Sequence, residues 1–329
     1  MSNANETAAA PSATATKGSQ NMGRLLEGKI ALVTGAGHGI GRGHAVELAK
    51  HGATVIVNDL GSSVGGEGSG RDADVVADLI RSRGGVASSN YGDVSDEEQA
   101  AAMVQQAIDE YGRLDILVNN AGIVRDRVIW NMSADDFDLV MRVHVRGSWL
   151  LCRAASQHWR DRAKAGDGKV FGRIINTTSG AGLLGNFGQT NYATAKAALA
   201  GLTLTLNLEL ARIGVTVNCI SPGGITRLSA GVAGDGSAVR EPDEYGDDEF
   251  EAMDPSLCSP VVAWLCSDEA SHVSGHIIRA MGERLSLMGG WTQDITILNG
   301  GKRWDATKLG DRFATEIFKT RAPGLQPFS

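Results

Sequence analysis

Short apolar segments alternate with longer segments of helical spacing along most of the chain. Seven runs of apolar or β-branched residues predict strands at residues 29–34, 54–59, 85–91, 114–119, 172–178, 215–220 and 276–280. Stretches with apolar residues every three or four positions predict helices at residues 40–51, 71–83, 95–111, 133–165, 192–212 and 256–267. At the start of the third helix, Ser95 and Glu98 have the spacing of a capping box.

The predicted strands are apolar at nearly every position instead of at every second one. This pattern is typical of strands that are buried on both faces, as in a parallel sheet between two layers of helices. We therefore predict an α/β fold, a Rossmann-type, doubly wound sheet of seven parallel strands with helices on both faces. Such sheets bind their ligands in a crevice at the carboxyl ends of the strands.

Three segments lie outside this regular pattern. Residues 1–23 are rich in small and polar residues and are predicted to form a disordered tail, so the domain proper spans residues 24–282. Residues 283–329 contain two tryptophans and predict an ordered C-terminal extension, packed on the core or on a neighbouring subunit. Between residues 241 and 254, eight of fourteen residues are acidic, and they form either a solvated loop or a mobile lid.

Composition and charge narrow the class of protein. The chain has 329 residues, 42% of them hydrophobic, which is enough for a substantial core. Its formal net charge of -7 argues against a general nucleic-acid binder, which needs a basic surface. There is no run of 18 apolar residues and no apolar signal segment near the start, so we expect no membrane span and a cytoplasmic location. The four cysteines form no CxxC pair, which predicts reduced thiols and no metal site.

A glycine-rich loop follows the first predicted strand and opens the first predicted helix. Residues 34–41 read TGAGHGIG, and such glycines let the backbone approach a pyrophosphate at a helix N-terminus. Asp59 ends the second predicted strand, 18 residues after Gly41. A carboxylate there accepts hydrogen bonds from ribose hydroxyls and repels a 2′-phosphate, which favours NAD over NADP. Asp59 could also be an ordinary turn residue, and His38 beside the glycines could help to hold a phosphate.

Further segments occur in an order that resembles the short-chain dehydrogenase/reductase family. The glycine spacing TGxxxGxG is followed by NNAG at residues 119–122, by Ser179, by YxxxK at residues 192–196 and by Pro222-Gly223. Ser179 lies 13 residues before Tyr192. The resemblance covers residues 29 to about 282 and implies a nicotinamide-dependent oxidoreductase with a homodimeric or homotetrameric assembly.

The resemblance also implies which residues form the site. The catalytic residues that it implies are Ser179, Tyr192 and Lys196, with His144 at a position where most members of the family have Asn. His144 could hold a water of the proton relay or be an ordinary buried histidine. Its cofactor-binding residues are Gly35, His38, Gly39, Ile40, Gly41, Asp59, Leu60, Asp93, Val94, Asn120, Ala121, Gly122, Tyr192, Lys196, Pro222, Gly223 and Thr226. The interval from Pro222 to Thr226 is one residue shorter than usual.

The spacing of Tyr192 and Lys196 places both on one face of a predicted helix. The ammonium of Lys196, together with the positive charge of an oxidised nicotinamide, favours the phenolate of Tyr192 and lowers its pKa. Tyr192 can then take the proton of a substrate hydroxyl while hydride leaves to the cofactor, and Ser179 can stabilise charge on the substrate oxygen.

Other segments resemble one branch of the family, the (3R)-hydroxyacyl-CoA dehydrogenase domains of peroxisomal multifunctional enzymes type 2 and their bacterial relatives. These segments are residues 57–61, 142–147, 185–189 and 274–304. The branch implies NAD-dependent interconversion of a secondary alcohol and a ketone on a (3R)-hydroxyacyl-CoA or a steroid-like substrate. Two alternatives stay open: an NADPH-dependent 3-oxoacyl reductase of fatty-acid synthesis, and a catalytically silent NAD-binding regulator.

Overall fold

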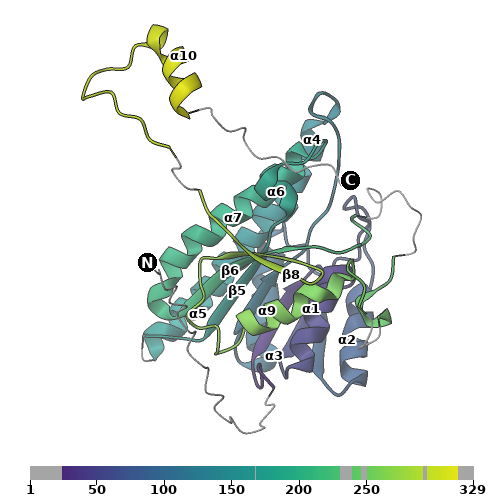
Figure 1. Cartoon of the computed structure of the whole chain (residues 1–329). Helices are drawn as coiled ribbons and strands as arrows, with labels where there is room; N and C mark the ends of the chain where they lie inside the picture. Colours follow the sequence, from purple (N-terminus) through teal and green to yellow (C-terminus); the bar gives the residue numbers. More distant parts are fainter. Residues whose placement is uncertain (1–23, 167, 230–238, 246–249, 292–294, 318–329) are drawn as a thin grey trace, which may run out of the picture.

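The fold is built on one sheet, whose strands run through the middle of the molecule (Figure 1). The structure is a computed structural model that describes residues 24–166, 168–229, 239–245, 250–291 and 295–317. Within these residues the strand order is β3-β2-β1-β4-β5-β6-β7-β8. The strands are β1 (Ile30–Thr34), β2 (Thr54–Asn58), β3 (Val86–Asn90), β4 (Ile116–Asn119), β5 (Gly172–Thr177), β6 (Val215–Pro222), β7 (Ile277–Met281) and β8 (Arg284–Met288).

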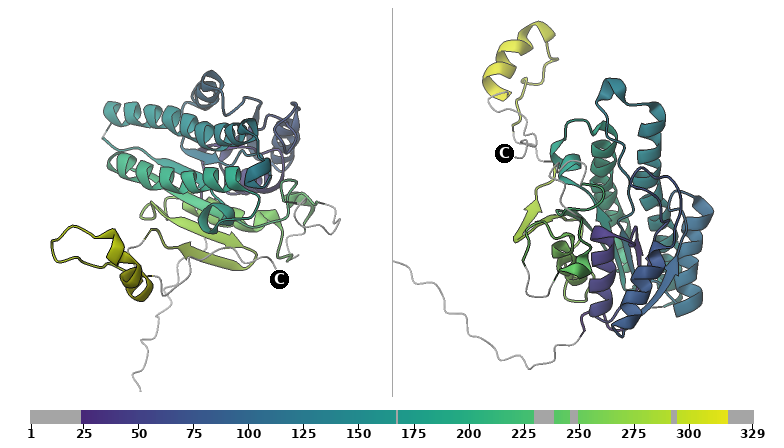
Figure 2. Two further views of the ribbon diagram at one scale, coloured as in Figure 1. Left: turned by 90° about the horizontal axis from the view of Figure 1, so that it is seen from above. Right: turned by 90° about the vertical axis from the view of Figure 1, so that its right-hand side faces the viewer.

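Helices cover both faces of this sheet, which Figure 2 shows as the middle layer. The helices are α1 (Gly39–Lys50), α2 (Asp72–Ser82), α3 (Glu97–Tyr111), α4 (Ala134–Met141), α5 (Ser148–Ala165), α6 (Gly180–Leu184), α7 (Thr190–Leu210), α9 (Ser259–Leu265) and α10 (Leu309–Arg312). The predicted Rossmann-type, doubly wound architecture is confirmed. None of the described helices has the length and apolar character that a membrane crossing requires.

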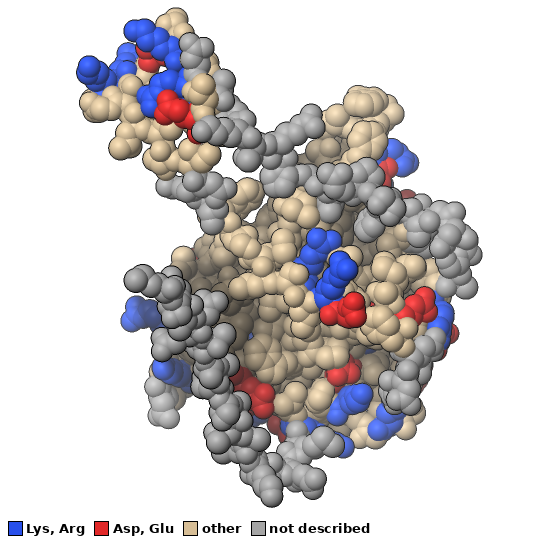
Figure 3. All heavy atoms as spheres, in the orientation of Figure 1, with Lys and Arg blue, Asp and Glu red and all other residues tan. Residues whose placement is uncertain are grey.

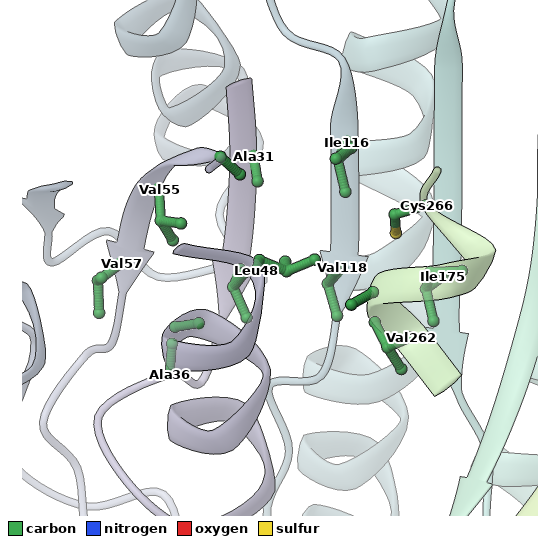
Figure 4. Close-up of a cluster of buried hydrophobic side chains, with 14 of the residues drawn as sticks. Ala31, Ala36, Leu48, Val55, Val57, Ile116, Val118, Ile175, Val262 and Cys266 are labelled. Atoms are coloured by element: carbon green, nitrogen blue, oxygen red, sulfur yellow. The ribbon is translucent and has the colours of Figure 1, made fainter. Parts of the chain in front are cut away.

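Two hydrophobic clusters hold the layers together, one on each face of the sheet. In β1, Ala31 and Val33 belong to the cluster with α1, α2 and α9, which Figure 4 shows in close-up. Ile30 and Leu32 belong to the opposite cluster, with α3, α5 and α7. Successive side chains of a strand point to opposite faces, so a strand that is buried on both sides must be apolar throughout.

The sheet has one strand more than the seven that we predicted. Seven strands are parallel, and β8 pairs antiparallel with β7 through contacts such as Ile277 opposite Met288. The prediction missed β8 because its apolar residues Leu285 and Leu287 alternate with Arg284 and Ser286, and both leucines are exposed. An edge strand with a solvated face lacks the continuous apolar run by which the other strands were found.

Two details of the predicted helices are wrong. The stretch predicted as one helix at residues 133–165 is divided into α4 and α5 by a π-helical turn at Arg142–Gly147. The start of α3 is capped by Asp96, whose side chain accepts a hydrogen bond from Gln99 N, and not by Ser95. Asp and Ser are both good capping residues, so the sequence alone could not separate two neighbouring candidates.

The C-terminal segment, residues 295–317, lies away from the sheet in every view (Figures 1 and 2). Arg312 makes contacts within this segment: its guanidinium lies 5.1 Å from the centre of the Trp304 ring and donates to Leu298 O at 3.2 Å. Figure 3 shows basic and acidic side chains mixed on this segment. Its packing on the core or on a neighbouring subunit stays a prediction, and the predicted tail 1–23 lies outside the described residues.

Candidate active site

A cleft of about 910 Å³ opens at the carboxyl ends of the central strands. Every candidate catalytic and cofactor-binding residue that the sequence indicated lines this cleft. They are Gly35, His38, Gly39, Ile40, Gly41, Asp59, Leu60, Asp93, Val94, Asn120, Ala121, Gly122, His144, Ser179, Tyr192, Lys196, Pro222, Gly223 and Thr226. The strands that carry these residues are neighbours in the sheet, so residues up to 191 positions apart, Gly35 and Thr226, reach one cavity.

The glycine loop between β1 and α1 is held tightly against the end of β4. The side-chain amide of Asn120 donates to Thr34 O and Gly35 O, both at 3.0 Å. A Cβ at Gly41 would lie 2.1 Å from Gly35 O, and Gly35 itself has φ +60. No other residue type fits either position without moving the backbone. The loop therefore presents bare backbone to the cleft, which fits close approach by a pyrophosphate.

Asp59 lies at the end of β2, facing the glycine loop. Its carboxylate accepts hydrogen bonds from Gly37 N at 2.8 Å and Gly61 N at 2.7 Å. These two bonds fix the orientation of the carboxylate and leave lone pairs on both oxygens. The geometry fits an acceptor for ribose hydroxyls.

His38 lies between two carboxylates at the start of α1. Its Nδ1 is 2.5 Å from Glu241 Oε1, and its Nε2 is 3.0 Å from Asp72 Oδ2. The hydrogen bond with Glu241 raises the pKa of His38 above 6.5, although burial and the charge of Arg227 oppose this. Burial acts to raise the pKa of Glu241, but the hydrogen bonds from His38 and Gly39 outweigh it and lower that pKa. The positive charge of His38 is thus compensated within the chain.

Tyr192 and Lys196 stand one turn apart near the start of α7. Lys196 is 3% exposed, and its Nζ donates to Thr177 O at 2.7 Å and lies 5.5 Å from the centre of the Tyr192 ring. The buried side chain of Asn191 anchors this end of the helix, since its amide donates to Arg125 O at 2.9 Å. Ser179 lies at the end of β5, where its Oγ accepts from Ala181 N at 3.2 Å.

Burial dominates the titration of this pair. It raises the pKa of Tyr192 to about 12, against the hydrogen bond with Ser179. It lowers the pKa of Lys196 to about 8. In the chain by itself the pKa of Tyr192 is therefore raised and not lowered. The lowering that we predicted depends on the positive charge of an oxidised nicotinamide as well as on Lys196.

His144 lies on the π-helical turn and contacts Tyr192 edge to face, with ring centroids 5.3 Å apart. Its Nε2 is 2.8 Å from Ile123 O, and Nδ1 has no hydrogen-bond partner among the described residues. Burial lowers the pKa of His144 to about 3, so the ring is neutral. Nε2 also lies 3.1 Å from Ile123 N, so according to the tautomer it donates to the Ile123 carbonyl or accepts from the Ile123 N–H. A Cβ at Gly122 would lie 2.3 Å from His144 Cε1, which explains why NNAG ends in glycine here.

Thr226, whose spacing departs from the usual one, packs against the glycine loop. A Cβ at Gly39 would lie 3.0 Å from Thr226 Cγ2. The backbone N–H of Thr226 donates a hydrogen bond to Ser229 Oγ at 2.8 Å. The structure thus places Thr226 over the first residue of α1, and its contact with a cofactor stays a prediction.

The sequence analysis did not single out several residues at the site. Gln189 Nε2 donates to Asp126 Oδ2 at 2.8 Å, and the charge of Asp126 contributes to the raised pKa of Tyr192. Arg142 and Arg279 line the cleft together with Arg227. The segments that contain Arg142, Gln189 and Arg279 resemble the hydroxyacyl-CoA branch, and that resemblance was the available signal for them.

Comparison with known proteins agrees with this geometry. The family model for short chain dehydrogenase matches residues 29–232. Hydroxyacyl-CoA dehydrogenase ChsB1 of Mycobacterium tuberculosis is 40% identical over 289 residues, which are 86% of this chain and 87% of that protein. Peroxisomal multifunctional enzyme A of Dictyostelium discoideum is 44% identical over 255 residues, 77% of this chain but only 53% of that protein.

The solved structures give the same result. The crystal structure of a short chain dehydrogenase from Mycobacterium avium superposes with a TM-score of 0.78 at 42% identity, over 91% of this chain and 98% of that one. An identity of this size goes beyond a shared fold. The chain therefore belongs to the short-chain dehydrogenase/reductase family, and it is an oxidoreductase that acts on CH–OH groups with a nicotinamide cofactor.

Proposed function

We propose that the protein interconverts a (3R)-hydroxyacyl-CoA and the 3-ketoacyl-CoA, with NAD as the hydride acceptor. The observation that carries this proposal is the arrangement of the cleft. Ser179, Tyr192 and Lys196 lie in the same cavity as the glycine loop and Asp59, and the rest of the lining includes apolar side chains and three arginines.

Asp59 supports NAD over NADP. Its carboxylate is fixed by Gly37 and Gly61 and faces the position where an adenosine ribose would lie beside the glycine loop. A 2′-phosphate there would meet the negative charges of Asp59, Asp72 and Glu241, and His38, a cation beside them, already pairs with two of them. When bound, NAD would supply the hydride acceptor.

The catalytic residues divide the remaining work. Tyr192, as the phenolate, takes the proton from the substrate alcohol in oxidation, and its hydroxyl returns the proton in reduction. Ser179 donates a hydrogen bond to the substrate oxygen and stabilises the charge that develops there. Lys196, held by Thr177 O, places a positive charge beneath Tyr192 that favours the phenolate.

The lining of the cleft supports an acyl-CoA substrate. Its apolar side chains include Val64, Ile123, Val124, Leu139, Phe187, Ile225, Leu228 and Met253. Phe187 is 84% exposed, so an apolar surface extends to the rim. Arg142, Arg227 and Arg279 supply positive charge that the phosphates of CoA could use. The similar hydroxyacyl-CoA dehydrogenase of Mycobacterium tuberculosis supports the same choice.

A steroid-like alcohol is the second candidate, because the apolar lining suits a fused-ring substrate. Such a substrate carries no phosphates and would not need the arginines. Two further functions are weaker. Asp59 opposes an NADPH-dependent 3-oxoacyl reductase, and the complete set of Ser179, Tyr192 and Lys196 opposes a catalytically silent regulator.

Steady-state turnover with NAD and with NADP tests these candidates against two panels, (3R)-hydroxyacyl-CoA thioesters of several chain lengths and hydroxysteroids. We expect thioester oxidation with NAD. Turnover only of free ring alcohols would move the assignment to steroid-like substrates. Preference for NADPH in thioester reduction would refute the NAD assignment, and NAD binding without turnover of either panel would support the regulator.

The assembly is proposed to be a homodimer or homotetramer. Trp149 on α5 and Leu204 and Leu208 on α7 are exposed in the single chain, and Leu208 has 77% of its surface exposed. Apolar side chains on neighbouring helices are typical of subunit interfaces. Sedimentation equilibrium of the full chain measures the assembly directly, and a monomer at micromolar concentration would contradict it.

A further inference from the structure

Part of the acidic run binds the start of α1. We call residues 239–245 the acidic strap, although this segment begins before the run. It contains a short 3₁₀ turn, Pro242–Glu244, which Glu241 and Glu244 cap reciprocally, and Pro242 is buried. The strap is therefore an organised piece of backbone and not simply a solvated loop.

Two side chains of the strap, Glu241 and Asp243, attach it to α1. Glu241 Oε2 accepts a hydrogen bond from Gly39 N at 2.7 Å, and Glu241 Oε1 lies 2.5 Å from His38 Nδ1. One turn along the helix, Arg42 donates to Asp243 Oδ2 at 2.8 Å. The side chains of Arg42 and Asp243 are 11% and 15% exposed, so this ion pair is largely shielded from solvent.

The local sequence leaves the start of α1 without an anion of its own. In the described chain the N-cap residue, His38, makes no side-chain capping hydrogen bond, and the first turn contains no acidic residue. The first N–H groups of a helix have no partner within it and carry a partial positive charge, so they attract an anion. Glu241, about 200 positions along the chain, supplies that anion.

The same N–H groups belong to the cradle that faces the cofactor. Gly39, Ile40 and Gly41 line the cleft beside Asp59. A carboxylate that accepts from Gly39 N does what an oxygen of a pyrophosphate would do at a helix start. Two anions that share these donors would repel each other at close range.

We propose that the Glu241 carboxylate is an internal substitute for the cofactor's pyrophosphate at Gly39 N. The cofactor must displace this carboxylate when it binds. Glu241 thereby sets the affinity for the nucleotide: the strap's contacts with α1 stabilise the nucleotide-free chain and weaken binding by the same amount. The inference rests on the proposed function, because it takes a dinucleotide to be the ligand of this cleft. It adds the residue that tunes how tightly that ligand is held.

The test compares four full-length chains: wild type, Glu241→Gln, Glu241→Asp and Glu251→Gln. Glu241→Gln removes the charge and keeps the size of the side chain, and Glu241→Asp keeps the charge but shortens its reach. Glu251→Gln is the matched control, because it removes the same charge from an exposed residue that lies 3.5 Å from Arg240 of the strap. Thermal melts verify that each chain is folded.

Affinity is measured by fluorescence titration with NADH and by calorimetric titration with ADP, which carries the diphosphate but no nicotinamide. We expect both Glu241 variants to bind NADH and ADP about tenfold more tightly than wild type, as loss of a charge-assisted competing contact implies. Glu251→Gln should bind as wild type does. Unchanged affinity in the Glu241 variants would overturn the proposal, and weaker binding would show that Glu241 contacts the nucleotide.

The two ligands separate failure of this proposal from failure of the proposed function. If wild type binds NADPH in preference to NADH, the NAD assignment fails, while the effect of Glu241 on ADP still decides the role of the strap. If hydroxyacyl-CoA is oxidised with NAD and Glu241→Gln changes neither titration, the function stands and the internal substitute is refuted.

Discussion

The part of the cleft around Tyr192 and Lys196 and the C-terminal segment, residues 295–317, are held by different kinds of contact. Lys196 is buried and bonded to Thr177 on another element, whereas Leu298 is 80% exposed and Arg312 contacts residues of its own segment. Long-range contacts fix the positions of the candidate catalytic groups, and local contacts fix the arrangement within a segment. The comparison teaches where a substitution should matter most, which is where partners come from distant parts of the sequence.

The largest effect, on turnover, is expected at Tyr192. Tyr192→Phe removes the hydroxyl that transfers the proton and keeps the ring that packs on His144. We expect turnover to fall by about 10²- to 10⁴-fold with little change in NADH affinity, since general acid–base catalysis contributes this much. Turnover and NADH titration measure the two quantities. Retained turnover would remove Tyr192 from its role as the proton carrier.

Acid should weaken the buried parts next. Burial lowers the pKa of His44 and of His144 to about 3. As pH falls below about 6.5, these histidines therefore bind protons in the unfolded chain but stay neutral in the folded chain. Stability from these two groups is complete above pH 6.5 and is lost as pH falls. At pH 5.5 each histidine should lower the free energy of unfolding by about 1.4 kcal/mol relative to its value well above pH 6.5, or by about 3 kcal/mol together.

Urea unfolding at several pH values measures this loss, and His44→Leu provides the comparison. The variant should be less stable at neutral pH, because His44 Nδ1 lies 2.9 Å from Ser259 Oγ, but its stability should depend about half as much on acid. His38 acts in the opposite direction: its raised pKa gives stability that is present below pH 6.5 and lost as pH rises through the folded value. An unchanged pH slope in His44→Leu would contradict the assignment.

A smaller effect is expected at the ribose end of the cleft. Asp59→Ala removes an acceptor for the ribose hydroxyls and a negative charge that repels a 2′-phosphate. We expect the ratio of NAD to NADP affinity to narrow by about ten- to thirtyfold. Asp59→Asn is the control for the bonds to Gly37 and Gly61, because its amide oxygen can still accept one of them. An unchanged ratio in both variants would count against the ribose assignment.

The smallest effect on the fold is expected from the other region. A chain that ends at Gly290 keeps β8 and removes Trp291, which is 94% exposed, together with everything after it. We expect the free energy of unfolding to change by less than about 1 kcal/mol, as for surface changes generally. Sedimentation equilibrium of the same chain shows whether the extension joins subunits. A large loss of stability would mean that the segment packs on the sheet in solution.

The sequence predicted best what is decided locally. Residues 34–41 indicated their turn because glycine permits both positive φ and close approach, and β1 indicated its burial because four of its five residues are apolar. These properties belong to a few adjacent residues and do not depend on the rest of the chain. The seven parallel strands and the position of the cleft followed from them.

What the sequence could not predict depends on contacts between distant residues. Glu241 finds His38 about 200 positions away, and nothing in the acidic run distinguishes it from its neighbours. The π-helical turn at Arg142–Gly147 interrupts a stretch whose apolar spacing is otherwise helical. The raised pKa of Tyr192 results from burial, which is a property of the packed molecule and not of YxxxK.

The position of β1 also bears on how the protein is made. β1 lies between β2 and β4, and the backbone of Ile30 bonds to the carboxylate of Asp115, 85 residues further along. A growing chain emerges from the ribosome at about 5–20 residues per second, so β1 is exposed for several seconds before its second neighbour exists. Its five apolar and β-branched residues must avoid other chains during that interval. Slow association of nascent chains, or cover by a chaperone, would protect this strand during synthesis.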